Sequence, residues 1–398
     1  MPFSKCFIYN PTCDMAVENG TNSYMAPENL RIFENDISPL MAFLGSNKDK
    51  IICNCELNEL KNFWTSLNFD YPQVLKQENA LLTNHQNQIY PWGWSQLITK
   101  KFSKTKTTTQ YWPNFSNQDT KELFSRITTY KLAKELSKLK QAKHDFIHPI
   151  SIPEKIIQIA DAEKMLALNP NGIVLKTLWS SSGRGLIFVR NKKDLSITEP
   201  WLTSKIRQHQ FVLAEAILDK VQDASLQFII NENNEYEFLG INYFDADSQG
   251  RFDKEYFHTP NHLQNTIPDT EGWIGEVANM IINSMKAIHL HNKYKGPVGV
   301  DALFFKTQSG DLKFYPLIEA NLRCNMGLIN LALKKRIHSK AQGSWKIEAF
   351  KPGEAAKFYK DQIKKNPVVL RGGLIYKGFI PLTSFHENQQ FAAWGLIP

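Results

Sequence analysis

The chain has 398 residues, of which 42% are apolar, and a formal net charge of +8. This length predicts two or three domains with a sizeable buried core. No apolar stretch approaches the length that a membrane-spanning helix needs, and the first ten residues lack the apolar core of a signal peptide. We therefore expect a cytoplasmic protein that does not act at a membrane.

The cysteine and lysine content argues against three further classes of protein. The five cysteines are odd in number and lack paired C-x-x-C spacing, so neither a disulfide framework nor a zinc site is indicated. A basic run occupies residues 100–106, but no repeated aromatic residues accompany it. We interpret this run as a solvated loop and expect no nucleic-acid partner.

The first 118 residues show short apolar strands that alternate with helix-like segments. Residues 6–9 and 50–53 are the clearest strands, and the alternation predicts a small α/β domain. The loop after the first strand leaves the sheet at the edge where α/β folds commonly bind ligands. Asp14, Glu18 and Asn19 in this loop are candidates for substrate contact and, at least as much, for helix capping and turn formation.

Two segments with helical periodicity follow, at residues 128–139 and 274–288. In the second segment, Val277, Ile281 and Met285 mark one apolar face. This helix would deliver the chain to the strand that begins near residue 298.

An apolar strand that ends in a lysine is followed by a loop rich in serine and glycine. Lys176 closes the strand at residues 173–176, so its ammonium group would have a fixed position suited to phosphate oxygens. Glycines in the loop allow successive N–H groups to turn toward an anion, and the serines and the arginine add donors. An ordinary hairpin turn with a surface lysine is the alternative. The loop residues are Ser180, Ser181, Ser182, Gly183, Arg184 and Gly185.

Two alternating apolar stretches carry polar side chains at their outer ends. Residues 301–305 and 314–319 are joined by a turn-like segment, which predicts an antiparallel strand pair. Glu319 and Asn321 are two positions apart and therefore point to the same face of a strand, where Asp301 could join them. Hard oxygen ligands of this kind suit Mg²⁺. Ordinary charges at a solvated strand end are the alternative.

These segments resemble the ATP-grasp family over about residues 120–335. The Lys176 strand, the Ser/Gly loop, a hinge-like segment at 211–218 and the Asp301…Glu319-x-Asn321 pair occur in the family's order and at roughly its spacing. The resemblance implies an α/β fold class with two α+β lobes, preceded by a Rossmann-like domain. The expected divisions are an N-terminal domain at 1–118, a first lobe at 119–213, a second lobe with the metal site at 214–340 and a C-terminal extension at 341–398.

The resemblance also implies a set of ligands for ATP and Mg²⁺. ATP would lie between the two lobes, and Asp301, Glu319 and Asn321 would bind the metal. A basic residue at the start of an earlier helix would contact phosphate, for which Arg126 is favoured over Lys131, and Asp223 is favoured over Asp219 as the ribose partner. The residues that the resemblance assigns to the nucleotide are Arg126 or Lys131, Lys176, Ser181, Ser182, Gly183, Arg184, Gly185, Glu215, Ala216, Ile217 and Asp223.

The Asn321-x-Arg323 sequence is similar to that of the family members that activate carboxylates. There the arginine steadies an acyl phosphate or the incoming acid, so Arg323 and Lys176 are the candidate catalytic residues. The resemblance implies a ligase that joins a small carboxylate to an amine, with an amino acid or short peptide as substrate. A small-molecule kinase and a nucleotide-binding regulatory protein without turnover are the alternatives. These features are compatible with a homodimer.

Overall fold

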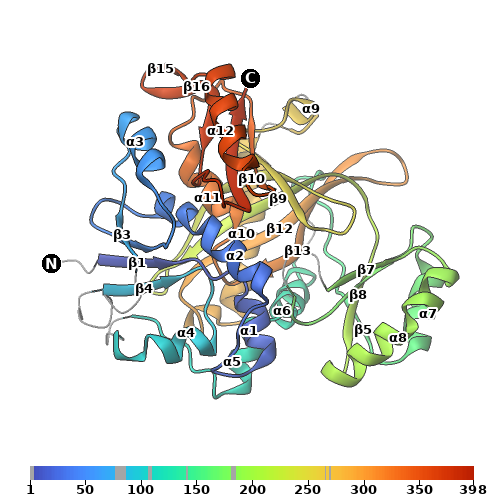
Figure 1. Ribbon diagram of the computed structural model, residues 1–398. Helices are drawn as coiled ribbons and strands as arrows, with labels where there is room; N and C mark the ends of the chain where they lie inside the picture. The colour runs from blue at the N-terminus through green and yellow to red at the C-terminus, as the bar shows by residue number, and fades with distance from the viewer. Residues whose placement is uncertain are drawn as a thin grey trace.

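The computed structural model describes residues 4–76, 87–105, 110–139, 142–180, 185–264, 266–268 and 270–398. Three sheets organise these residues, and Figure 1 shows how they are arranged. The four residues 181–184 of the predicted Ser/Gly loop lie outside the described residues.

The N-terminal domain is built on a parallel sheet with the strand order β3-β2-β1-β4. The strands predicted at residues 6–9 and 50–53 are confirmed as β1 and β2, and the parallel arrangement is that of Rossmann-like folds. The strands are β1 (Ser4–Ile8), β2 (Lys50–Ile52), β3 (Gln73–Leu75) and β4 (Asn87–Pro91). The helices are α1 (Cys13–Asn19), α2 (Glu28–Ile37), η1 (Ser38–Leu44), α3 (Asn58–Ser66), α4 (Gln96–Lys101) and η3 (Ser103–Thr105).

A small antiparallel sheet, with the order β5-β8-β6-β7, forms a separate lobe that we call the small lobe (residues 154–216). Its apolar side chains form their own cluster with the two helices that cover the sheet. The hinge-like segment at 211–218 lies largely in β8, and the lobe boundary expected at 213 falls inside that strand. The elements are β5 (Glu154–Ile156), α7 (Ile159–Leu168), β6 (Ile173–Lys176), β7 (Leu186–Val189), α8 (Lys192–His209) and β8 (Val212–Ala216), preceded by α5 (Gln118–Leu123) and α6 (Arg126–Leu136).

The third sheet has nine strands in the order β13-β12-β9-β10-β11-β14-β17-β16-β15. Its first five strands are β9 (Asp219–Ile230), β10 (Tyr236–Ala246), β11 (Phe252–Tyr256), β12 (Gly296–Lys306) and β13 (Leu312–Asn321). Its last four are β14 (Ser344–Ala349), β15 (Val369–Arg371), β16 (Leu374–Pro381) and β17 (Phe391–Ile397). The accompanying helices are α9 (Asn261–Gln264), α10 (Thr270–Ala287), η4 (Leu290–Asn292), α11 (Met326–Lys334) and α12 (Glu354–Lys365).

The predicted helix at residues 274–288 is confirmed as α10, which packs on one face of the large sheet. Val277, Ile281 and Met285 are buried there in the largest hydrophobic cluster. Trp273 at the start of α10 lies 4.8 Å from Phe314 of β13, measured between ring centroids. The apolar periodicity of the sequence therefore identified the face that α10 buries.

The N-terminal domain and the C-terminal strands share one hydrophobic cluster. Leu40 and Trp64 come from the first domain, Ile380 and Ala393 come from β16 and β17, and all four are fully buried. The indole N–H of Trp64 donates to the carbonyl oxygen of Pro381 at 2.8 Å. Residues beyond 340 therefore complete the core of the N-terminal domain.

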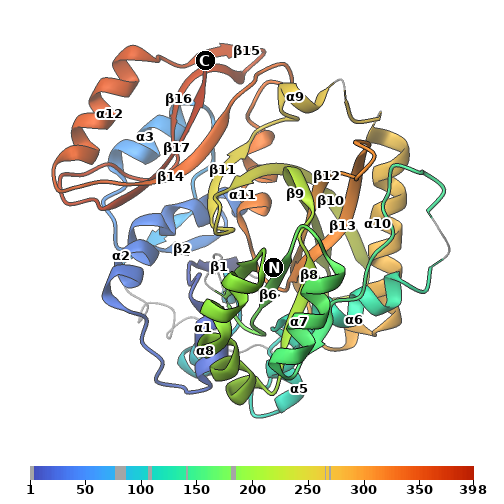
Figure 2. The same ribbon diagram turned by 90° about the vertical axis from the view of Figure 1, so that its right-hand side faces the viewer.

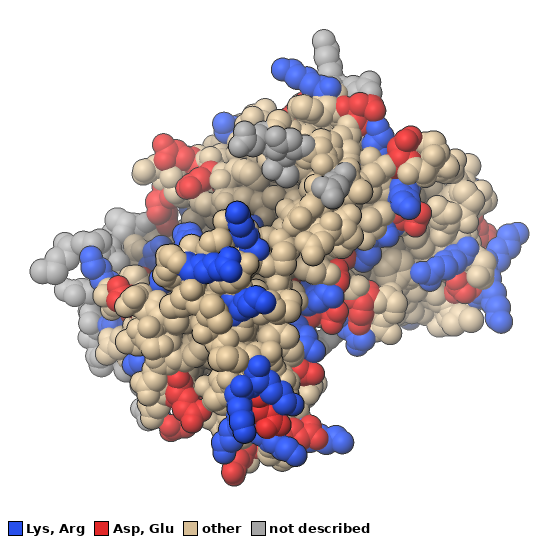
Figure 3. All heavy atoms as spheres, turned by 90° about the horizontal axis from the view of Figure 1, so that it is seen from above, with Lys and Arg blue, Asp and Glu red and all other residues tan. Residues whose placement is uncertain are grey.

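Two surface features bear on the partners of the protein. Among the residues that the structure describes, no helix has the length and apolar character needed to cross a lipid bilayer. On the face seen in Figure 3, Lys and Arg side chains form small groups separated by uncharged surface and by acidic side chains. This face lacks the continuous basic stripe that is typical of nucleic-acid binding.

We predict that Trp64→Phe lowers the free energy of unfolding by about 1–3 kcal/mol, because it leaves the buried Pro381 carbonyl without its donor. Trp394→Phe is the matched control. It also removes an indole N–H bond, to Glu348, but at a half-buried position where water can take the donor's place. Urea denaturation would measure both, and an equal loss in the two variants would contradict the role of the Trp64 contact.

Candidate nucleotide and metal site

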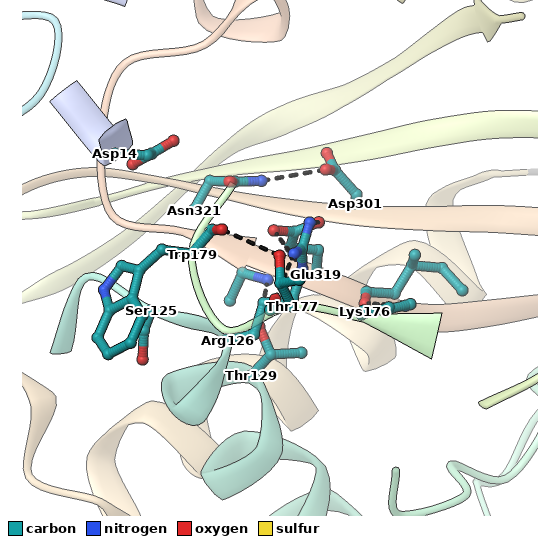
Figure 4. Close-up of polar contacts among 12 residues, drawn as sticks. Asp14, Ser125, Arg126, Thr129, Lys176, Thr177, Trp179, Asp301, Glu319 and Asn321 are labelled. Carbon is teal, nitrogen blue, oxygen red and sulfur yellow. Dashed lines mark hydrogen bonds and ion pairs between the residues drawn. The ribbon is translucent and has the colours of Figure 1, made fainter. Parts of the chain in front are cut away.

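The three predicted metal ligands come together at the paired ends of β12 and β13. Asp301 lies directly opposite Glu319 in the strand register, and Asn321 lies opposite Gly299. The Asn321 Nδ2 donates to Asp301 Oδ2 at 3.0 Å (Figure 4). We call Asp301, Glu319 and Asn321 the β12–β13 group, and its geometry is the one that the antiparallel pairing predicts.

The electrostatics of the β12–β13 group favour a bound cation. Burial is the main cause, and Glu319 the next, of a pKa of Asp301 raised to about 7. Carboxylates held together away from water are unfavourable unless a cation or a proton neutralises them. Carboxylate and amide oxygens are the ligands that Mg²⁺ prefers, so the donor set fits that ion.

The amide of Asn321 is needed to complete this donor set. In the described part of the chain, no three His, Cys, Asp or Glu side chains are grouped closely enough to hold a metal by themselves. The Asn321 Oδ1 accepts a hydrogen bond from Arg323 Nη2 at 3.0 Å, while its Nδ2 faces Asp301. Rotation of the amide by half a turn would present oxygen to a cation beside Asp301. It would also release Arg323 Nη2, because the NH₂ group of Asn321 cannot accept a hydrogen bond from it.

Arg126 reaches the β12–β13 group from the first turn of α6. Its Nε lies 3.0 Å from Glu319 Oε1, and its Nη2 donates to Glu319 Oε2 at 3.1 Å. Its Nη1 donates to the carbonyl oxygen of Thr177, directly after β6, at 2.6 Å. Of the two predicted phosphate ligands, the structure thus brings Arg126 to the site, whereas Lys131 is exposed on α6. No local sequence pattern indicates that Arg126 pairs with Glu319, which is 193 positions away.

Lys176 also joins the small lobe to the large sheet. It closes β6, where only 5% of its side chain is exposed, and its Nζ lies 2.8 Å from Glu215 Oε1 of the neighbouring β8. The same Nζ donates to the carbonyl oxygen of Ile318 in β13 at 3.2 Å. The predicted phosphate lysine therefore points at the β12–β13 group and is held by protein acceptors.

The turn between β6 and β7 depends on a close backbone approach at its described end. The N–H of Thr177 donates to the carbonyl oxygen of Gly185 at 2.9 Å. A Cβ at Gly185 would lie 2.2 Å from Thr177 Oγ1, so this position requires glycine. Ser181, Ser182, Gly183 and Arg184, predicted to contact phosphate, lie outside the described residues.

The predicted adenine and ribose contacts lie along β8 and β9. Glu215 is engaged with Lys176, Ala216 is exposed at the strand end, and the N–H of Ile217 already donates to the carbonyl oxygen of Gly172 at 3.0 Å. Asp223 lies 2.6 Å from the Lys220 Nζ, and burial raises the pKa of its carboxyl group.

Arg323 lies next to the β12–β13 group and is held by the N-terminal domain. Its Nε donates to Asp14 Oδ2 at 3.0 Å, and its Nη1 donates to the Cys324 carbonyl oxygen at 3.3 Å. Burial raises the pKa of Asp14 although Arg323 opposes this effect. Sequence reasoning placed Asp14 in a ligand-binding loop but did not connect it with Arg323, which is 309 positions away.

Glu18, the second candidate for substrate contact, instead links the N-terminal domain to the small lobe. Its Oε1 lies 3.3 Å from His209 Nε2 and 3.9 Å from Lys205 Nζ, and it accepts from Gln208 Nε2 at 3.3 Å. All three partners lie at the C-terminal end of α8, within the helix, and Figure 2 shows α8 beside α1. Glu18 therefore makes a contact between domains, and its contact with substrate stays a prediction.

The space at the site is small while these ion pairs are in place. Asp14, Arg126, Trp179, Glu319 and Arg323 are among the residues around a cavity of about 20 Å³. This volume suits one water molecule or one ion. A larger ligand would have to separate the small lobe from the large sheet.

The arrangement of the whole chain is similar to solved structures that span almost the same length. The N5-carboxyaminoimidazole synthetase from Staphylococcus aureus, complexed with ADP, is 11% identical with a TM-score of 0.51, over 100% of this chain and 93% of that one. The biotin carboxylase domain of 2-oxoglutarate carboxylase from Hydrogenobacter thermophilus is 12% identical with a TM-score of 0.54, over 100% and 87%. Biotin carboxylase from Campylobacter jejuni is 12% identical with a TM-score of 0.53, over the same shares.

No protein-family model and no curated protein matches the chain. At identities this low, the likeness to the solved structures concerns the fold. It agrees with the sequence motifs, the small lobe and the paired strands that carry the carboxylates. The chain therefore has the ATP-grasp fold, preceded by an N-terminal α/β domain.

Proposed function

We propose that the protein is an ATP-dependent ligase that joins a carboxylate to an amine through an acyl phosphate. The observation that carries the proposal is the strand register that gathers Asp301, Glu319 and Asn321, with Arg323 hydrogen-bonded to the Asn321 side chain. Arg126 and Lys176 bring positive charge to the same place from two other elements. This combination supplies metal ligands, phosphate ligands and a guanidinium for an acid.

Two of the similar solved structures support the choice of nucleotide and metal. The Staphylococcus aureus synthetase is complexed with ADP, and the Hydrogenobacter thermophilus domain is in complex with ADP, MgADP and bicarbonate. We propose by analogy that ATP binds between the small lobe and the large sheet. Its phosphates would replace Glu215 and Glu319 as partners of Lys176 and Arg126.

In the proposed reaction, Arg323 exchanges its bonds to Asn321 and the Cys324 carbonyl oxygen for two parallel N–H bonds to the substrate carboxylate, which lysine cannot provide. One carboxylate oxygen attacks the γ-phosphorus, the bond to the β,γ-bridging oxygen breaks, and ADP leaves. The amine then attacks the acyl carbon, phosphate departs with the bonding electron pair, and the amine loses a proton. A Mg²⁺ ion held by the β12–β13 group would supply neutralisation of phosphate charge.

The direct test is a screen of acids and amines for ADP release, with the product masses measured. The ligase proposal requires that turnover depend on both an acid and an amine and that the product mass equal their sum minus water. Phosphorylation of an alcohol would replace the ligase by a kinase. Nucleotide binding without hydrolysis across amino acids, short peptides and other small acids would favour a regulatory protein.

We predict that Glu319→Gln lowers magnesium-dependent turnover by roughly 10²-fold or more, because it removes a charged oxygen ligand where phosphate charge is neutralised. Asp311→Asn is the matched control, since this exposed carboxylate lies in the turn of the same hairpin. Steady-state ADP release over a range of Mg²⁺ concentrations would measure the effect. Equal activity in the two variants would refute the metal assignment.

The raised pKa of Asp301 predicts a pH dependence of stability that Mg²⁺ should change. A raised carboxyl pKa stabilises the fold fully below about pH 4, where unfolded aspartate titrates, and this contribution is lost as the pH rises through about 7. The free energy of unfolding without metal should therefore fall between pH 5 and pH 8 by more in the native protein than in Asp301→Asn.

Chemical denaturation in EDTA and in Mg²⁺ would measure this difference. Mg²⁺ favours the ionised carboxylate, so it should reduce the fall in the native protein and have little effect on the fall in Asp301→Asn. The same response to Mg²⁺ in both proteins would show that Asp301 does not bind the ion.

The variant Arg323→Lys tests the reaction type. Its KM for ATP should be unchanged, and its rate of amide formation should fall by roughly 10²-fold or more. Arg336→Lys, outside the β12–β13 group, is the control. Hydroxylamine added with ATP and the acid should yield a hydroxamate with the native protein. Amide formation that survives Arg323→Lys undiminished would remove Arg323 from the reaction.

A further inference from the structure

A second cavity, of about 210 Å³, lies between the edge strand β4 of the N-terminal domain and the ends of β9 and β12. Apolar surface exceeds polar surface on its walls, and Lys5, Glu232, Lys295 and Arg323 are its charged lining residues. We call it the aromatic pocket. Its aromatic lining residues are Tyr90, Trp92, Trp94, Tyr111 and Tyr294.

The rings of the aromatic pocket are fixed by one another and by the backbone. Tyr111 packs edge to face against Trp94 and Tyr294, with centroid distances of 6.0 and 5.5 Å. The Tyr111 hydroxyl donates to the Lys293 carbonyl oxygen at 2.9 Å, and that of Tyr294 donates to the Pro297 carbonyl oxygen at 2.7 Å. Because these two hydroxyl groups are already bonded, Tyr111 and Tyr294 offer ring surface to a ligand rather than polar donors.

The exposed edge of β4 is partly closed to an added peptide strand. The side chain of Gln110 accepts from the N–H of Ile89 at 3.3 Å and donates to its carbonyl oxygen. A peptide that paired with β4 would have to displace this side chain. The volume is also below the 300–1,000 Å³ of typical sites for drug-sized ligands. Both facts favour a compact small molecule.

The inner end of the aromatic pocket is tied to the candidate reaction site. Arg323 lines both the pocket and the 20 Å³ cavity beside the β12–β13 group. The N–H of Cys324 donates to the Trp92 carbonyl oxygen at 2.7 Å. A Cβ at Gly93 would lie 2.3 Å from Cys13 Sγ and 3.3 Å from Arg323 Cβ, so the loop after β4 lies tightly against Arg323.

We propose that the aromatic pocket holds the organic part of the acid substrate, which is a compact carboxylic acid with an apolar ring or a branched apolar chain. Its carboxylate lies on Arg323, and its apolar group lies against Trp94 and Tyr111. This assignment rests on the proposed ligase function, because it places the acid within reach of the nucleotide phosphates. Small polar acids would leave the ring surfaces in contact with water.

The test uses the full-length protein with Mg²⁺, ATP and hydroxylamine as the common amine. Phenylacetate, phenylalanine and isovalerate represent apolar acids, and acetate, glycine, succinate and glutamate represent small or polar ones. The kcat/KM for hydroxamate formation should be about 10-fold or more higher for the best apolar acid than for the best polar one.

Variants of the pocket wall test whether the aromatic pocket causes this preference for apolar acids. Trp94→Ala should raise the KM for the preferred acid by about 10-fold and leave the KM for ATP unchanged, and Tyr111→Leu is a second, milder variant should Trp94→Ala fail to fold. Tyr376→Ala, in the hairpin formed by β15 and β16, is the control.

The outcomes separate the two proposals. Hydroxamates formed best from polar acids, or unchanged KM values in both wall variants, would overturn the aromatic pocket and leave the ligase function standing. Absence of both hydroxamate and ADP release with every acid would overturn the ligase function, and the assignment of the pocket with it.

Discussion

The ion pair between Arg126 and Glu319 is the contact on which the arrangement of the site depends. It joins α6 to the edge strand of the large sheet, and the second amino group of Arg126 reaches the backbone just after β6. Lys176 joins the small lobe to the same edge strand through the Ile318 carbonyl oxygen, and its ion pair with Glu215 lies within the small lobe. Positive groups suited to phosphate are therefore already neutralised, and a nucleotide that binds as we propose would have to exchange one set of ion pairs for another.

Such an exchange has a definite physical consequence. Each buried charge would lose a protein partner only when a phosphate or a metal takes its place, so an unpaired buried charge is avoided at every stage. Binding of a phosphate without a cation is disfavoured for the same reason. A phosphate without a cation would displace Glu319 from Arg126 and leave two neighbouring carboxylates, Glu319 and Asp301, without compensation.

Local sequence patterns predicted the elements well, and long-range partners much less. The alternation at residues 301–321 determines which side chains share a face of the hairpin, so the β12–β13 group could be identified from spacing alone. Asp14 with Arg323 and Glu18 with α8 could not be found in this way. Periodicity indicates which side of an element is buried but does not say which element covers it. The divisions at 118, 213 and 340 stay predictions for the same reason.

The core shared by the first domain and the last strands has a consequence for folding during synthesis. Domains commonly fold in order as the chain leaves the ribosome. Here Trp64 and its neighbours cannot pack against Ile380 and Ala393 until β16 and β17 have been synthesised. The core of the N-terminal domain therefore stays incomplete, with apolar surface exposed, until almost the whole chain has been synthesised. Chaperone dependence and aggregation of nascent chains should consequently be concentrated in the earliest part of the sequence rather than the latest.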